Sequence, residues 1–219
     1  MAKADSDSDF YQDLSAGSIR PRLDLFDPRE TAAVANKELG LGEIIGAIAH
    51  GNSGSGVPIS VSPILYRFTF GLEHLSAEEL EQLWPFALRL AGSVATFETE
   101  RRRAHLLADW ALREVLPAVL EANGATNAAE NLRNLEPINN AANAVLAELA
   151  ARSIGKINNG SVGSAAFAAA NSAYFCSSPL GFEKAGISAA HVAADAIRAG
   201  AKREAILQMQ LAVLDRVCP

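Results

Sequence analysis

Alanine dominates two segments of the chain, AAFAAANSAYF at residues 165–175 and AGISAAHVAADAIRA at residues 185–199. Alanine is the best helix former and a poor strand former, so both segments are predicted to be helices. Because alanine has little volume, a core built from such helices requires close approach of one helix to another. The two segments therefore favour an all-α fold.

Helical periodicity continues on both sides of these two segments. A last helix is predicted over residues 203–217, and an earlier one is predicted to begin at Pro137. The apolar face of that earlier helix is marked by Ile138, Ala142, Val145, Leu146 and Leu149. Asn158-Asn159-Gly160 is expected to be the turn that follows it, and Gly200 is expected to end the helix at residues 185–199.

Two prolines lie inside apolar helical patterns. Pro117 stands in the run at residues 94–122, which Asn123-Gly124 ends with a left-handed cap, and Pro85 stands in the helix that follows Ser76. A proline inside a helix removes one backbone hydrogen bond and bends the helix. Each proline is therefore predicted to coincide with a bend or a break.

The region from residue 62 to residue 90 carries two helix-start signals. Ser76 and Glu79 have the spacing of a capping box, in which each side chain accepts from the backbone of the other. Ser62-Pro63 is expected to open a helix over residues 64–72, with a strand over residues 65–70 as the alternative. These signals predict that two helices begin in this part of the chain.

The N-terminal part is predicted to be less regular. Residues 1–25 are polar and aperiodic, which is typical of a flexible arm. Helices are expected from Pro28 to Leu39 and over residues 43–50, followed by a Gly- and Ser-rich mobile loop at residues 51–61. The helical domain would then cover residues 26–219. Its expected architecture is a single irregular helical bundle of about eight or nine helices.

Charge and composition exclude several classes of protein. The net charge is −6, and the densest basic stretch, Arg101 to Arg103, follows Glu98 and Glu100. Pairing of Glu98 with Arg102 would neutralise this stretch on a solvated helix face, so nucleic-acid binding is not expected. The uncharged residues 157–182 contain too many Asn, Gly and Ser for a membrane span, and no signal peptide opens the chain. Cytoplasmic localisation is therefore expected.

A His–Asp pair occurs twice at helical spacing. His105 and Asp109 lie four residues apart, as do His191 and Asp195, so each pair shares one helix face. Two such pairs facing each other could supply the nitrogen and oxygen ligands of a transition metal. The alternative is that each pair is only a local hydrogen bond, with the flanking alanines allowing the two helices to cross closely. We expect the two helices to be neighbours without a shared ligand, and no metal is assigned.

No other catalytic motif is found in the sequence. There is no G-x-S-x-G nucleophile motif, and neither Cys176 nor Cys218 stands in a CxxC or Cys/His pattern. Both cysteines are expected to be free thiols, and Cys176 is expected to fill a buried position. The glycines at residues 51–56 lack the lysine and the preceding strand of a phosphate-binding loop. No catalytic residue and no cofactor are predicted.

Three segments of the second half resemble one family. They are LADWALREVLP at residues 107–117 with Glu121 behind it, AAHVAADA at residues 189–196, and QMQL at residues 208–211 with Leu214 after it. Together with the alanine-rich middle, they are similar to the immunity proteins of bacterial toxin–immunity systems, a small all-α family. The resemblance covers roughly the half of the chain from Arg101 onward. It implies an all-α fold and the neutralisation of a cognate toxin.

Three functions follow as hypotheses. The leading one is a cytoplasmic binding protein that blocks a cognate toxin by occlusion, which requires a complementary surface and no catalytic group. A second is a structural or self-associating helical module, and homo-oligomers are an option in either case. A third is a metal-dependent helical enzyme that uses His105, Asp109, His191 and Asp195. The expected partner is a protein, with no role for nucleic acid or membrane.

Overall fold

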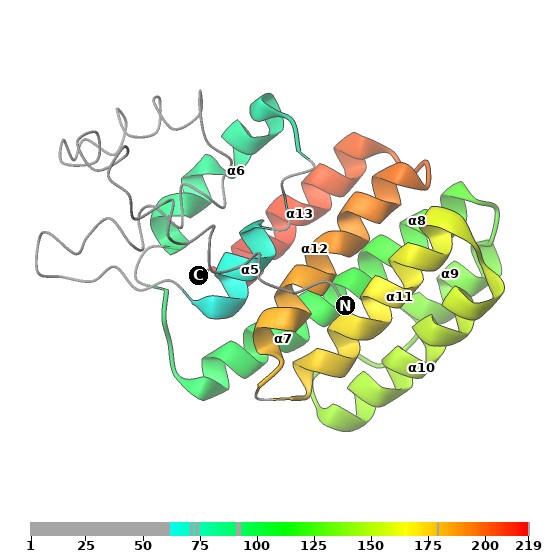
Figure 1. Ribbon diagram of the computed structural model, residues 1–219, viewed down its shortest axis with the longest axis horizontal. Helices are drawn as coiled ribbons and strands as arrows, with labels where there is room; N and C mark the ends of the chain where they lie inside the picture. The colour runs from blue at the N-terminus through cyan, green and yellow to red at the C-terminus, as the bar shows by residue number, and fades with distance from the viewer. Residues whose placement is uncertain (1–61, 71, 73–74, 91–92, 179, 219) are drawn as a thin grey trace, which may run out of the picture.

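The computed structural model describes residues 62–70, 72, 75–90, 93–178 and 180–218. This described part of the chain is helical and contains no strand, which confirms the all-α prediction (Figure 1). The expectations for the arm, for the helices before residue 51 and for the loop at residues 51–61 lie outside the described residues. The elements are α5 (Pro63–Phe70), α6 (Ala77–Leu90), α7 (Phe97–Trp110), the π-helical segment η2 (Ala111–Val115), α8 (Leu116–Ala122), α9 (Thr126–Arg133), α10 (Ala141–Ile157), α11 (Gly160–Cys176), α12 (Phe182–Arg198) and α13 (Arg203–Val217).

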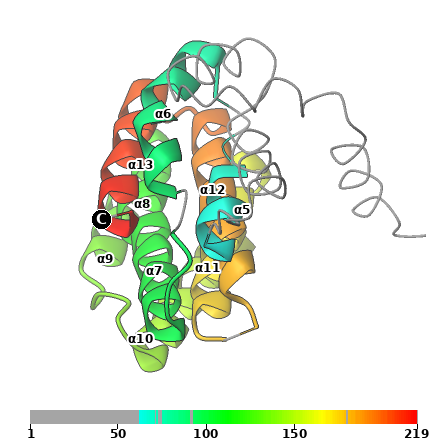
Figure 2. The ribbon, with the colours of Figure 1, turned by 90° about the vertical axis from the view of Figure 1, so that its left-hand side faces the viewer.

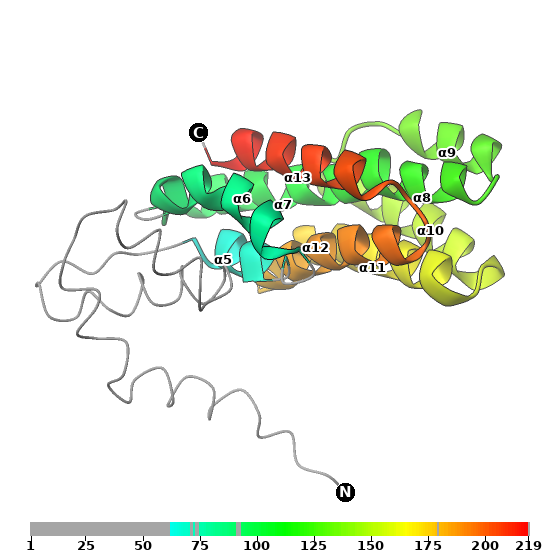
Figure 3. The same cartoon turned by 90° about the horizontal axis from the view of Figure 1, so that it is seen from above.

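The helices lie in two layers. In one layer α5, α12, α11 and α10 follow one another side by side, and in the other α7 continues through η2 into α8, flanked by α13 and α9 (Figures 1 and 3). The rod formed by α7, η2 and α8 packs across α11 and α12, and this contact holds the layers together (Figure 2). One continuous cluster of buried apolar side chains fills the space between them.

The layer that contains α11 and α12 is built by small residues. Most of the buried side chains of both helices are alanines, which confirms the close approach expected from the sequence. The Ser172 hydroxyl donates a buried hydrogen bond of 2.9 Å to the carbonyl of Ala185, from one helix to the other. A Cβ atom on Gly186 would lie 2.5 Å from the carbonyl oxygen of Ile64, so glycine alone fits where α12 crosses α5.

The predicted start of α6 is confirmed in atomic detail. The Ser76 amide donates to the Glu79 carboxylate at 2.7 Å, and the Glu79 amide donates to the Ser76 hydroxyl at 3.3 Å. Glu79 also accepts two hydrogen bonds from Arg203 of α13, at 2.6 and 2.5 Å. The capping box therefore both begins α6 and ties it to α13. The strand alternative for residues 65–70 is wrong, because these residues belong to α5.

The two prolines behave differently. Pro117 follows the π-helical segment η2 and stands in the first turn of α8, so the predicted break occurs there. A π-helical turn bonds each amide to the carbonyl five residues back, which accommodates a position without an amide donor. Pro85 lies inside α6, which is assigned as helix without interruption from Ala77 to Leu90. The helix is therefore not broken at Pro85.

The predicted orientation of α10 is also wrong. The helix begins at Ala141 and not at Pro137. Asn140 caps its start by accepting a hydrogen bond of 2.9 Å from the amide of Asn143. Its buried residues are Ala144, Ala147, Ala151 and Gly155. Val145, Leu146 and Leu149 are exposed by 49%, 60% and 56%. Because α10 packs closely on α11, only small side chains fit between the two helices, and the large apolar ones point away from the core.

Candidate functional site

Helices α7 and α12, which carry the two His–Asp pairs, are in contact as expected. His105 and Asp195 are buried, whereas His191 is exposed to solvent. Among the described residues, no group of three or more His, Cys, Asp or Glu side chains is placed to hold one metal ion. The candidate ligands are thus on neighbouring helices, but the structure does not bring them together.

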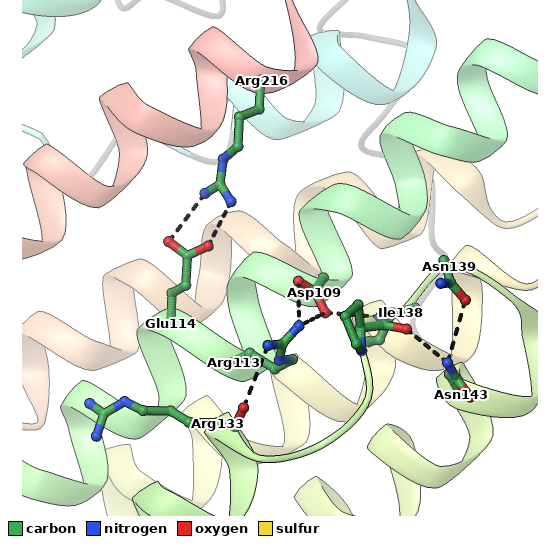
Figure 4. Close-up of polar contacts among 9 residues, drawn as sticks. Asp109, Arg113, Glu114, Arg133, Ile138, Asn139, Asn143 and Arg216 are labelled. Carbon is green, nitrogen blue, oxygen red and sulfur yellow. Dashed lines mark hydrogen bonds and ion pairs between the residues drawn. The ribbon is translucent and has the colours of Figure 1, made fainter.

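Asp109 has a structural partner on another element. Its carboxylate accepts a hydrogen bond of 2.9 Å from the amide of Ile138, in the loop that precedes α10 (Figure 4). Arg113, one turn later, donates to the same carboxylate at 3.3 and 3.4 Å. Asp109 therefore fastens the loop between α9 and α10 to α7. This contact joins residues 29 positions apart, which helical spacing could not indicate.

Asp195 and His105 are the other two candidates inside the fold. The Asp195 carboxylate accepts from Arg198 at 2.7 Å, so it is engaged within its own helix. Burial and the nearby Arg101 lower the pKa of His105, against the opposing effect of Glu98. A lowered pKa keeps the imidazole neutral at physiological pH. His105 is therefore an uncharged side chain on the buried side of α7.

The two cysteines are buried thiols, and the predicted buried position of Cys176 is confirmed. Burial raises the pKa of Cys176 to about 12 and that of Cys218 to about 11. Since the thiolate is the nucleophile, a thiol with such a pKa is almost entirely unreactive at neutral pH. Neither cysteine is in a state suited to covalent catalysis.

The arginines at residues 101–103 do not share one environment. Arg101 pairs with Glu98 at 2.7 Å, three residues away, instead of the predicted pair between Glu98 and Arg102. Arg103 is buried, where it pairs with Glu100 at 2.8 Å and donates to the carbonyl of Val217 at 3.1 Å. The expectation of a wholly solvated basic face is therefore wrong for Arg103. The buried guanidinium of Arg103 is tolerated because its hydrogen-bond donors are engaged by groups on α7 and α13.

A cluster of ion pairs surrounds η2 (Figure 4). Glu114 accepts from Arg216 of α13 at 2.7 and 3.1 Å. Arg133 of α9 donates to Glu121 of α8. With the pair of Arg113 and Asp109, each of these three arginines faces a carboxylate. The cluster is neutral as a whole, so it joins α9 and α13 to the central rod and offers no excess charge to a ligand.

Exposed apolar side chains gather at one end of the molecule. Phe97 begins α7 and is 56% exposed, Leu180 lies just before α12 and is 96% exposed, and Val94 precedes Phe97 by three residues. The ring of Phe97 lies 5.4 Å from that of Phe182, so the start of α7 and the start of α12 meet here. We call Val94, Phe97 and Leu180 the end patch. Figure 1 shows both helix starts at the same end of the molecule.

The end patch and the exposed face of α10 are the two surfaces that the sequence did not reveal. Their side chains are ordinary core residues by type, and no motif marks them. Only the position of each helix in its layer shows that these residues face outward. Both surfaces expose large apolar side chains to solvent.

Comparisons with known proteins found no match to a protein-family model, to a curated protein or to a solved structure. Among the described residues, no helix has both the length and the apolar character that a membrane crossing requires. The resemblance of residues 107–117, 189–196 and 208–211 to immunity proteins thus rests on those segments alone.

Proposed function

We propose that this protein is an immunity-type binding protein, which neutralises a cognate bacterial toxin by covering the toxin's active surface. The end patch is the observation that carries this proposal. Leu180 and Phe97 present apolar area to solvent at the junction of α7 and α12, where a monomer gains nothing from exposing it. A partner that covered this area would bury a leucine and an aromatic ring together.

Charge favours a basic partner. The chain carries a net charge of −6, and part of that excess lies at its start, where Asp5, Asp7 and Asp9 alternate with serines. Next to the end patch, Glu98 and Glu183 are exposed, and each also pairs with an arginine, Arg101 and Arg67 respectively. An acidic protein accelerates its association with a basic toxin through long-range attraction. We propose a cytoplasmic setting, and a single irregular helical bundle as the rigid support of this surface.

The test is co-purification with the product of the gene next to the one that encodes this chain. A stable complex of fixed stoichiometry and rescue of growth are expected when the two proteins are expressed together. Leu180→Glu would place a charge in the end patch, so binding should weaken by about 30-fold or more, the range of an interface hot spot. Leu149→Glu makes the same change at another exposed leucine, on α10, and is the control.

Two outcomes would contradict the proposal. One is the absence of both complex and growth rescue for the unaltered chain. The other is a complex that Leu180→Glu leaves unchanged, which would place the interface elsewhere. Among the alternatives, the self-associating module is favoured by the exposed face of α10. The metal-dependent enzyme would require convergence of His105, Asp109, His191 and Asp195, which the arrangement described above does not provide.

A further inference from the structure

The outward face of α10 is a second apolar surface, distinct from the end patch. Helix α10 forms the edge of its layer and packs mainly against α11 (Figures 1 and 3). The side directly opposite its buried alanines is exposed along the whole helix. We call this side the α10 stripe, and its residues are Ala142, Val145, Leu146, Leu149, Ser153 and Ile157.

The α10 stripe is uncharged over most of its length. The only charged residues in α10 are Glu148, Arg152 and Lys156. Glu148 and Arg152 pair with each other at 2.7 Å and are only partly exposed, so they flank the stripe. Lys156 is exposed near the end of the helix. An approaching helix would therefore meet apolar side chains at the centre and a single charge at one end.

We propose that the α10 stripe binds the same stripe of a second copy of this chain, with the two helices antiparallel and Leu149 at the two-fold axis. A two-fold axis brings together residues equally distant from it on opposite sides. The stripe runs from Ala142 to Ile157, so its middle is at Leu149. Overlap of the two stripes is greatest when the axis passes there.

On either side of the central pair of Leu149 side chains, this arrangement matches large side chains with small ones at two positions. Residues four positions from the axis are Val145 and Ser153, so each valine meets a serine of the other copy. Residues seven positions away are Ala142 and Lys156, so the lysine stem lies over an alanine. Such alternation of large and small residues is what allows two helix surfaces to interlock.

Charge also fits a second copy in this orientation. Two Lys156 side chains lie on opposite ends of the pair, about 21 Å apart along the helix axes, so they do not repel each other strongly. Each lies toward the start of the partner helix, which an exposed Glu136 precedes. The antiparallel orientation also places opposite ends of the two helix dipoles together. A parallel pair would bring the two lysines together instead.

The size of the contact sets its strength. A helix of 17 residues is about 25 Å long and about 10 Å wide, so each copy would contribute about 250 Å² of footprint. Stable interfaces bury about 800 Å² per partner, well above this value. The dimer should therefore be weak and depend on concentration.

Sedimentation of the full chain over a wide concentration range tests the association. The unaltered chain is expected to shift from monomer to dimer as concentration rises. Leu149→Glu should leave only monomer, because two carboxylates would meet at the axis. Leu180→Glu makes the same change in the end patch, so it should leave the dimer intact. A chain that is monomeric at every concentration, or a dimer that Leu149→Glu does not weaken, would overturn the proposal.

Disulfide trapping tests the geometry. Leu149→Cys should form a covalent dimer under mild oxidation, because only residues near a two-fold axis meet their own copies. Ile157→Cys is a control with greater exposure, and its two copies would be about 24 Å apart. Both native cysteines are buried and do not interfere. Trapping at Ile157→Cys without trapping at Leu149→Cys would contradict the antiparallel pair.

Since Leu180→Glu affects only toxin binding, failure of this proposal can be distinguished from failure of the proposed function.

Discussion

Helices α10 and α12 have the same length and a similar alanine content, yet they are buried to very different degrees. In α12 eleven of 17 residues are buried, whereas in α10 only four of 17 are. The difference comes from position in the layer. α12 lies between α5 and α11 and across α7, while α10 has α11 on one side and solvent on the other. Composition therefore predicts that both are helices, and the neighbours decide which residues face the core.

The largest expected effect is from adding volume at the centre of α12. Ala190→Leu places a branched side chain at a fully buried position, so we expect a loss of about 3 kcal/mol in the free energy of unfolding. Ala142→Leu makes the same change on the exposed side of α10 and should alter stability by less than about 0.5 kcal/mol. Urea denaturation measures both. Equal losses would show that α10 is buried as deeply as α12.

A smaller difference is expected between two helical glycines. Alanine is normally favoured over glycine in a helix by about 1 kcal/mol. Gly186→Ala in α12 should nevertheless lose about 1–2 kcal/mol, because its Cβ would meet the backbone of Ile64. At Gly155 in α10 the nearest atoms, at 3.1 Å, belong to the ring of Phe167, an exposed side chain that can move. Gly155→Ala should therefore be neutral or slightly stabilising in the same measurement.

The smallest expected effect concerns α6, which is joined to α13 by an ion pair. The hydrogen bonds from Arg203 lower the pKa of Glu79 to about 2. Since its unfolded value is about 4.3, the contribution of Glu79 to stability is complete above that pH and is lost as pH falls toward about 2. Glu79→Gln should reduce this loss of stability at low pH. The reduction should be less than about 1 kcal/mol, because the ion pair lies near the surface. An unchanged acid unfolding curve at low salt would exclude the ion pair as its source.

The sequence predicted most helix boundaries where a local signal exists. Residues 203–217 are helical as predicted, and Gly200 adopts the left-handed conformation, with φ of 91°, after the preceding helix. The capping box at Ser76 also formed as predicted. In each case the responsible atoms lie within a few residues of one another. Local chemistry therefore determines where these helices begin and end.

The predictions failed where contacts between residues distant in the sequence determine the structure. Helix α9, TNAAENLR, was not predicted, because it is mostly polar and buries only Ala129 and Leu132. In α10 the leucines were predicted to face the core, but the close contact with α11 admits only small side chains. Asp109 was singled out for its distance from His105, whereas its partner is the amide of Ile138. None of these contacts is local, so periodicity could not reveal them.

The π-helical segment η2 also solves a problem of register along the central rod. The buried residues of α7, η2 and α8 repeat every four positions: Ala104, Ala108, Leu112, Leu116 and Leu120. In an uninterrupted α-helix a four-residue repeat rotates by about 40° at each step, so Leu120 would point far from the direction of Ala104. The wider turn at Ala111–Val115 removes part of that rotation. The rod can therefore keep one side toward α11 and α12 over its whole length.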